Sequence, residues 1–186
     1  MWKKFNNQEG YYYDLAGLSD GYVVVGNVGP YLSEAKGIIS KYSKEGEVIR
    51  SVTIDNYAYS SINAVYASSS HIIAVGAKGQ RADQLADAFI ICLDTNLNVA
   101  WIREFGGSEG EEYLDVISVA DGYIAVGTTS SHNGDMINFV YDESDYMGPY
   151  GFMVKYDLSG NVVWRNNISN LSEVKQVVEY NGSIYY

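Results

Sequence analysis

The sequence predicts an all-β protein, a β-propeller or a fragment of one, built from units of four antiparallel strands. Three observations predict this class: a segment pattern recurs about every 50 residues, the 186 residues include 18 Tyr and 19 Gly but only 2 Pro, and no long segment has helical periodicity. Aromatic side chains favour strands, and glycine favours the tight turns between them. A four-stranded unit of this length cannot bury both of its faces alone, so successive units are expected to stack radially.

The repeat is clearest in an apolar segment that ends in glycine, at residues 21–26, 71–76 and 122–127. A preceding strand is expected at 13–18, 62–66 and 114–119, and a following buried strand at 37–42, 88–93 and 151–156. A hairpin turn that leads into a fourth strand then occupies residues 43–50, 94–101 and 157–164. In the last two of these segments Asp and Asn side chains are expected to cap the turn backbone.

We interpret residues 1–186 as a single propeller domain or propeller fragment, with repeat units at approximately 11–54, 58–107 and 113–170. Residues 2–5 resemble the fourth strand of a unit, and residues 173–186 resemble the first two strands of another. Two arrangements stay open: a four-bladed ring closed by these terminal strands, or a fragment of a larger propeller, which we favour. Edge strands of a fragment expose unpaired backbone groups, so a homo-oligomer formed through blade edges is one expected way to cover them.

Three runs carry a resemblance to a known family: Lys155 to Trp164, its partial copy Cys92 to Trp101, and Asp121 to Gly127. They resemble blade repeats of bacterial propellers of the quinoprotein-like class, which carry PQQ-like repeats. The resemblance implies the fold but no single activity, because such propellers include dehydrogenases, outer-membrane assembly factors and surface binding modules. The chain departs from the pattern where Arg50 replaces the tryptophan and Leu97 replaces the turn glycine. The recurrence of Trp101 and Trp164 predicts packing between units.

Charge and composition exclude several classes of protein. Twelve Lys and Arg against 23 Asp and Glu give a net charge of −11, which opposes binding to nucleic acid or to an anionic membrane. No apolar run reaches the roughly 18 residues of a membrane-spanning helix. Cys92 has no second cysteine to pair with and is expected in the core. Residues 1–10 do not resemble a signal peptide, but an extracellular or cell-surface location is still favoured.

The strongest candidate site is the loop between Gly127 and Gly151, which is about a dozen residues longer than its counterparts. We predict ligand binding by Asp135 and Tyr141 in this loop, and by Tyr11 and Tyr12, whose rings suit stacking on sugars. Asp142, Glu143 and Asp145 are candidate calcium ligands. No complete calcium-binding loop motif occurs, so a solvated acidic loop is the alternative. The acidic segment with Glu109, Glu111 and Glu112 is expected on the same end of the propeller.

The two histidines give no catalytic site. His71 is expected as an exposed turn residue, and His132 follows Ser131 in a loop without a Gly-x-Ser-x-Gly motif. We therefore predict a non-catalytic propeller module, bacterial and secreted or on the cell surface, that binds a protein or a glycan through its loop-bearing face. The alternatives are part of a propeller enzyme and an assembly scaffold of the cell envelope. No cofactor other than the candidate calcium is expected.

Overall fold

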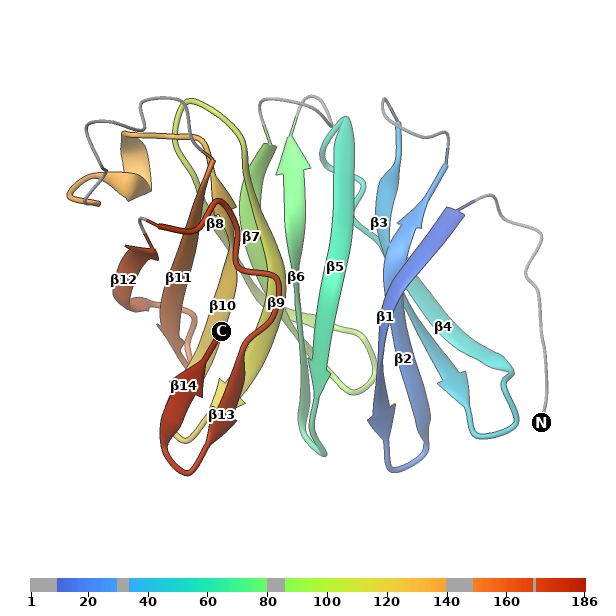
Figure 1. Ribbon diagram of the computed structural model, residues 1–186. Helices are drawn as coiled ribbons and strands as arrows, with labels where there is room; N and C mark the ends of the chain where they lie inside the picture. The colour runs from blue at the N-terminus through green and yellow to red at the C-terminus, as the bar shows by residue number, and fades with distance from the viewer. Residues whose placement is uncertain (1–9, 30–33, 80–85, 140–148, 169) are drawn as a thin grey trace.

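A computed structural model describes residues 10–29, 34–79, 86–139, 149–168 and 170–186, and in these residues the chain is all-β, as predicted (Figure 1). The elements are β1 (Gly10–Leu18), β2 (Gly21–Val28), β3 (Lys36–Ser43), β4 (Val48–Thr53), β5 (Tyr59–Ala67), β6 (His71–Gly79), β7 (Ala86–Asp94), β8 (Val99–Phe105), β9 (Glu111–Val119), β10 (Gly122–Thr129), the 3-10 turn η1 (Gly134–Met136), β11 (Tyr150–Asp157), β12 (Val162–Ile168), β13 (Val178–Tyr180) and β14 (Ser183–Tyr185). The strand expected at residues 2–5 lies outside the described residues.

Consecutive strands pair with one another in antiparallel sheets. Sheet 1 has the order β1-β2-β3-β4, sheet 2 has β5-β6-β7-β8 and sheet 3 has β9-β10-β11-β12, while β13 and β14 form a terminal hairpin. In each four-stranded sheet a bulge interrupts the pairing of the first strand with the second, at Tyr13, Asn63 and Leu114. The sequence repeat is therefore a structural repeat that extends to single residues.

The glycine that ends each repeat segment is required by this bulge. Gly26, Gly76 and Gly127 pair with the residue just before the bulge. A Cβ atom at any of the three would overlap a carbonyl oxygen of the facing first strand, that of Ser61 in the case of Gly76. The close approach of two backbones therefore explains why glycine recurs at these positions.

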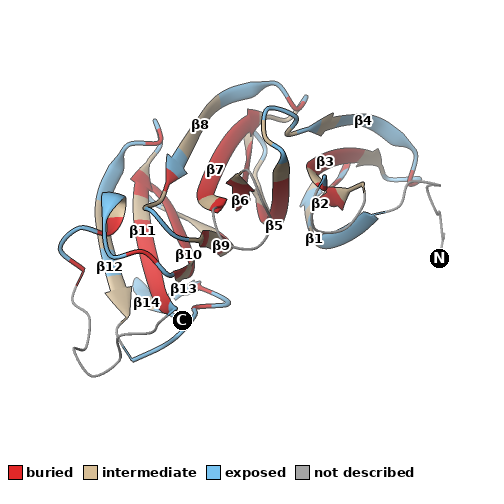
Figure 2. Cartoon of the chain, turned by 90° about the horizontal axis from the view of Figure 1, so that it is seen from above, coloured by how far each residue is buried: buried red, intermediate tan, exposed pale blue. Residues whose placement is uncertain are grey.

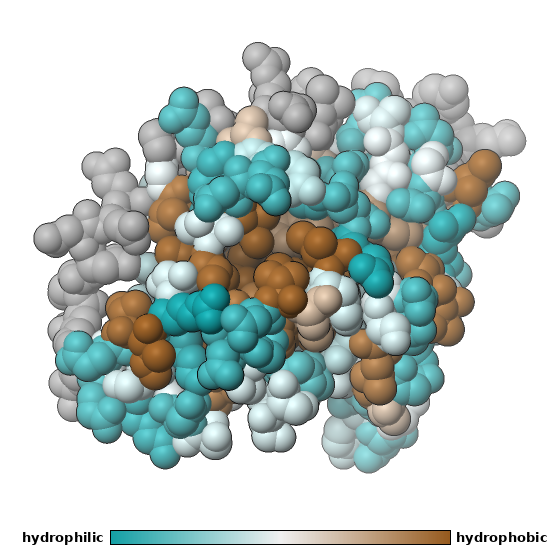
Figure 3. Space-filling view, turned by 180° about the vertical axis from the view of Figure 1, so that it is seen from behind, coloured by the Kyte–Doolittle hydropathy of each residue, from teal (hydrophilic) through white to brown (hydrophobic). Residues whose placement is uncertain are grey.

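The three sheets and the hairpin follow one another along an open arc (Figure 2). The first strands β1, β5, β9 and β13 lie on the inner side, where β5 contacts β1, β2 and β3, and β9 contacts β5, β6, β7 and β13. The outer strands β4, β8 and β12 face away. Figure 3 shows this outer side, where hydrophobic side chains lie in separate groups among hydrophilic ones. Within the described residues the ends of the arc do not meet.

The core lies between successive sheets. Between sheets 1 and 2 it contains Val23, Val25, Ile39, Ile62, Val65, Ile72, Phe89 and Ile91; between sheets 2 and 3 it contains Ile73, Val75, Ile90, Phe105, Tyr113, Val116, Tyr123 and Phe152; and between sheet 3 and the hairpin it contains Ile124, Val126, Met153, Val174 and Val177. Cys92 is buried in the second of these clusters, as expected. Each sheet thus depends on its neighbours to bury its faces.

Side chains near the bulges join the first strands across the sheet interfaces. The Asp14 carboxylate accepts a hydrogen bond from the Val65 N–H at 2.8 Å, and the Asp115 carboxylate accepts one from the Val177 N–H at 2.8 Å. Between sheets 2 and 3 the Asn63 side-chain amide instead donates to the Tyr113 carbonyl at 2.8 Å. These bonds fix the spacing of the strands that line the inner side of the arc.

The two departures from the tryptophan–glycine pattern compensate for each other. Trp101 packs against Gly160 in the outer turn of the next sheet. At the preceding interface Arg50 takes the place of the tryptophan and donates to the Asn96 carbonyl and the Asn98 side chain, at 2.8 and 2.9 Å. The narrower side chain leaves room for Leu97, which is buried and holds the same left-handed conformation, with φ +64°, as Gly160, with φ +79°. A wide partner thus requires glycine in the turn, whereas arginine permits leucine.

The predicted turn caps are confirmed. The Asp94 carboxylate accepts hydrogen bonds from the N–H groups of Asn96 and Asn98, and the Asp157 carboxylate accepts them from Ser159 and Asn161, all at 2.8 Å. Such bonds are the usual role of aspartate in tight turns.

Gly160→Ala is expected to destabilise the protein by about 1–3 kcal/mol, because alanine is strained at positive φ and its Cβ would lie 2.8 Å from the Trp101 ring. Urea unfolding followed by circular dichroism measures the loss. Gly182→Ala is the control, since Gly182 has φ +75° but no atom within 4 Å of the added Cβ. An equal loss in both variants would contradict the role of the tryptophan contact.

Candidate functional site

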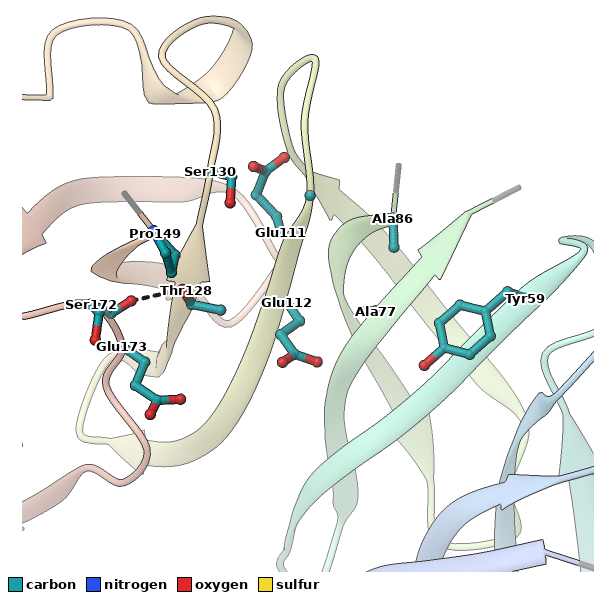
Figure 4. A pocket seen from close by; sticks show the side chains of 11 residues that line it. Tyr59, Ala77, Ala86, Glu111, Glu112, Thr128, Ser130, Pro149, Ser172 and Glu173 are labelled. Atoms are coloured by element: carbon teal, nitrogen blue, oxygen red, sulfur yellow. Dashed lines mark hydrogen bonds between the residues drawn. The ribbon is translucent and has the colours of Figure 1, made fainter. Parts of the chain in front are cut away.

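A cleft of about 400 Å³ opens between sheets 2 and 3, on the rim of the molecule that carries the β8–β9 and β10–β11 loops (Figure 4). Its lining comes from strands β5, β6, β7, β9 and β10 and from the segments that precede β11 and β13. The lining residues are Tyr59, Ala77, Ala86, Gly110, Glu111, Glu112, Thr128, Ser130, Pro149, Ser172 and Glu173. Three of these eleven residues are glutamates and none is basic, so we call the feature the acidic cleft.

Glu111 and Glu112 begin β9 and point to opposite sides of it (Figure 4). Glu111 is only 2% exposed, and its carboxylate accepts hydrogen bonds from the Gly107 N–H at 2.7 Å and the Thr129 hydroxyl at 2.8 Å. Burial raises the pKa of Glu111, and hydrogen bonds from Ser131 and Gly107 oppose the rise. Glu111 therefore ties the β8–β9 loop to β10 and forms a wall of the cleft.

Glu112 is the carboxylate that a ligand would meet. Burial raises its pKa, and the negative charge of Glu173 raises it further, while a hydrogen bond from Asn63 opposes the shift. That bond is long, 3.4 Å from the Asn63 amide nitrogen to the carboxylate. The negative charge of Glu173 thus disfavours the ionised form of Glu112, and a bound cation would relieve this cost.

Glu112→Gln is expected to raise the melting temperature by about 1–3 °C at pH 7.5 and to leave it unchanged at pH 4. The pKa of Glu112 is raised in the folded protein, so its ionisation favours the unfolded chain. This loss of stability is absent at pH values below the pKa of Glu112 in the unfolded chain. It becomes complete once the pH has risen above the pKa of Glu112 in the folded protein. Calorimetric melts at the two pH values check it. Glu111→Gln is the contrasting variant, expected to destabilise because it disturbs two hydrogen bonds.

The loops beside the acidic cleft lie at the same end of sheet 3, as the sequence led us to expect, and they also bond to each other. In the β10–β11 loop the Ser131 hydroxyl accepts a hydrogen bond from the Glu109 N–H at 2.8 Å, and the Asn133 side-chain carbonyl accepts one from the Ser108 N–H at 2.9 Å. The Asp135 carboxylate accepts one from the Gly106 N–H at 3.1 Å. The β8–β9 and β10–β11 loops therefore form one connected surface at this end of sheet 3.

The residues predicted to bind ligand are not brought together in the described structure. The Asp135 carboxylate accepts its hydrogen bond from the β8–β9 loop, and its Oδ1 atom lies 3.9 Å from Nη1 of Arg165. Asp135 does not line the acidic cleft. Tyr11 and Tyr12 lie on β1, in sheet 1, and are exposed. The remaining predicted residues lie outside the described residues: Tyr141, Asp142, Glu143 and Asp145.

The described residues contain no group of three or more His, Cys, Asp or Glu side chains that could hold a metal ion. In the same part of the chain no helix is long and apolar enough to cross a membrane.

Glu173 was missed in the sequence, although the repeat contains the signal for it. Counting from the bulge, Tyr11, Ser61 and Glu112 occupy one position in successive first strands, and the register of the terminal hairpin assigns Glu173, in the segment before β13, to the same position. The assignment of Glu173 agrees with its neighbour Val174, which packs on Gly151 as Ile62 packs on Gly37. One position of the repeat therefore supplies two residues that line the acidic cleft, Glu112 and Glu173. Tyr11 holds the same position in sheet 1.

The burial of Lys78 was also not predicted from the sequence. The Lys78 ammonium forms an ion pair with Glu104 and lies 3.6 Å from the centre of the Tyr57 ring. The Tyr57 hydroxyl donates to Glu104 at 2.9 Å, and the hydrogen bond from Lys78 lowers the pKa of that carboxyl. This cluster joins β6, β8 and the segment before β5, and it does not line the acidic cleft.

The histidine predicted to be exposed is half-buried instead. The His71 imidazole lies 3.0 Å from the Tyr123 hydroxyl of the next sheet, and burial lowers its pKa. His132 packs edge-on against Tyr150, with 5.7 Å between ring centres.

No model of a known protein family matches this chain, and no curated protein matches its sequence significantly.

Proposed function

We propose that this chain is a β-propeller module that binds a partner protein, without catalysis, by taking a basic side chain of that partner into the acidic cleft. The propeller assignment is supported by four-stranded antiparallel sheets that pack face to face in series, with their first strands on the inner side (Figure 2). The repeated bulge and the repeated bonds between first strands support it further.

The acidic cleft is the observation that carries the proposed binding function. It is concave, it lies where two connected loops meet, and its walls are strands of two packed sheets. Ligand sites commonly occupy such hollows on rigid scaffolds. The site therefore offers preformed walls, which lower the entropic cost of binding.

The lining favours a cationic partner over a neutral glycan. The carboxylates of Glu112 and Glu173 can accept charge-assisted hydrogen bonds from an ammonium or guanidinium group, which are stronger than bonds between neutral groups. Tyr59 on the opposite wall adds an aromatic ring suited to a cation. The net charge of −11 attracts basic partners at long range. Lysine or arginine in an exposed protein segment meets all three conditions.

The test uses a panel of short fluorescent peptides that carry lysine or arginine, each paired with a copy in which glutamine replaces the basic residue. We expect only the basic peptides to bind, in a fluorescence anisotropy titration, with an affinity that falls as salt rises. The double variant Glu112→Gln, Glu173→Gln should weaken binding at least about tenfold, as expected when charge-assisted bonds are lost.

The matched control is Glu45→Gln, Glu47→Gln, which removes the same charge from the outer turn of sheet 1. This variant should bind within about twofold of the unaltered chain, apart from a weak long-range effect. Equal weakening by both double variants, or equal binding of the glutamine peptides, would refute the proposal. Selective binding to a printed panel of neutral glycans that survives Glu112→Gln, Glu173→Gln would also count against it.

A further inference from the structure

In the described part of the chain, the two ends of the arc carry exposed apolar faces that correspond to the two sides of the internal sheet interface. The leading face, on sheet 1, consists of Tyr12, Leu15 and Tyr22, and the trailing face, on the terminal hairpin, consists of Val178, Tyr180 and Tyr185. All six residues are more than a third exposed, with Leu15 at 62% and Tyr180 at 66%.

The leading face repeats a surface that is buried elsewhere in the chain. By strand register, the positions of Tyr12, Leu15 and Tyr22 are held in sheet 2 by Ile62, Val65 and Ile72, and in sheet 3 by Tyr113, Val116 and Tyr123. These six counterparts are at most 8% exposed, because the preceding sheet covers them. Sheet 1 has the same apolar character at these positions, but no preceding sheet covers it in the described structure.

The trailing face repeats the surface with which each sheet covers the sheet that follows it. The hairpin pairs Val178 with Tyr185 and Tyr180 with Ser183, as sheet 1 pairs Ala16 with Val23 and Leu18 with Gly21. Val178, Tyr180 and Tyr185 therefore hold the positions of Ala16, Leu18 and Val23. In sheet 1 those three residues pack on Ile62, Val65 and Ile72 of sheet 2. The trailing face is thus matched, position by position, to the leading face.

We infer that the leading face of one molecule docks on the trailing face of a second copy of this chain, in the register of the internal sheet interfaces. Within the described residues the hairpin lies at the far end of the arc from sheet 1, so it does not cover the leading face of its own molecule (Figure 2). Both halves of the contact are encoded in one chain, and the contact continues an interface that the chain already forms three times.

The proposed contact joins two different surfaces, so it is heterologous and can close only as a ring. Two copies would bring together six four-stranded sheets and two hairpins, which is within the range of blade numbers known for propellers. Five of the six residues in the two faces are aromatic or β-branched, and tyrosine is enriched in the cores of protein interfaces. This inference concerns the ends of the arc and is independent of ligand binding in the acidic cleft.

The test is the mass of the protein by light scattering and sedimentation across a concentration series. We expect a dimer of the 20.6 kDa chain, and we expect Leu15→Lys to give a monomer at concentrations where the unaltered chain is dimeric. Leu158→Lys is the matched control, because Leu158 is 59% exposed but lies in the outer turn of sheet 3. It should remain a dimer. Circular dichroism and melting curves verify that both variants are folded.

Mixing distinguishes head-to-tail docking from other association. Tyr180→Lys alone should also be monomeric, since it alters the trailing face. Leu15→Lys keeps an intact trailing face and Tyr180→Lys keeps an intact leading face, so an equimolar mixture should form a one-to-one heterodimer through one intact contact, weaker than the unaltered dimer because its second contact carries both lysines. A monomer at every concentration, a dimer that persists in Leu15→Lys, or a mixture that stays monomeric would overturn the inference.

Discussion

Phe152→Ala is expected to reduce the free energy of unfolding by about 3–5 kcal/mol, the range for a large aromatic residue removed from a packed core. Phe152 lies on β11 and is fully buried. Its ring stacks on Phe105 of sheet 2, with 5.6 Å between ring centres and 10° between ring planes. Its ring centre also lies 5.2 Å from that of Tyr113 in sheet 3. The substitution therefore empties the centre of the interface between two sheets.

Urea unfolding followed by circular dichroism measures this loss. Phe152→Leu, which preserves most of the apolar volume, should cost less than half as much. In a chain whose sheets interact mainly with their neighbours, the damage should concentrate in sheets 2 and 3. Hydrogen exchange should then show faster exchange in β7 and β11 than in β2 and β3. A loss below about 1 kcal/mol would contradict the described packing, since even modest core truncations exceed it.

Elements within one unit could be predicted from the sequence because the forces that define them are local. Apolar segments of strand length alternate with turn residues, and the recurrence of glycine at 26, 76 and 127 marks the same strand three times. The capped turns at Asp94 and Asp157 follow from side-chain bonds to backbone groups two and four residues away. Such features need no knowledge of how the sheets stack.

Contacts between units could not be predicted in the same way, because they depend on the register in which separate sheets meet. His71 was expected to be exposed, as its place at a strand start suggests, yet stacking brings it to Tyr123 of the next sheet. The burial of Lys78 beside Glu104 and Tyr57 was not predicted at all, because it depends on contacts between strands and a loop that are distant in the sequence. The acidic cleft has the same origin, since Glu112 begins β9 of one unit and Glu173 lies in the segment before β13 of the next.

Gly76→Ala is expected to be strongly damaging for so small a substitution, with a loss of about 3 kcal/mol or more, at the upper end for overpacking. Gly76 lies in β6 opposite Ile62, where the bulge of β5 brings the Ser61 carbonyl against it. One methyl group would overlap that oxygen, and neither side can move easily because both are backbone atoms of paired strands. The strain must therefore separate β5 from β6 or remove the bulge.

The control for this prediction is Gly17→Ala in β1, a strand glycine with no atom within 4 Å of the added Cβ. It should be neutral or stabilise by up to about 1 kcal/mol, because alanine has less conformational freedom to lose than glycine. The bulge also positions Asn63, whose side chain bonds to the Tyr113 carbonyl of sheet 3. Gly76→Ala should accordingly speed hydrogen exchange in β9 as well as in β5, which links one repeated glycine to the spacing of the sheets. Equal stability of the two variants would show that the overlap is relieved without cost and that the glycine recurs for another reason.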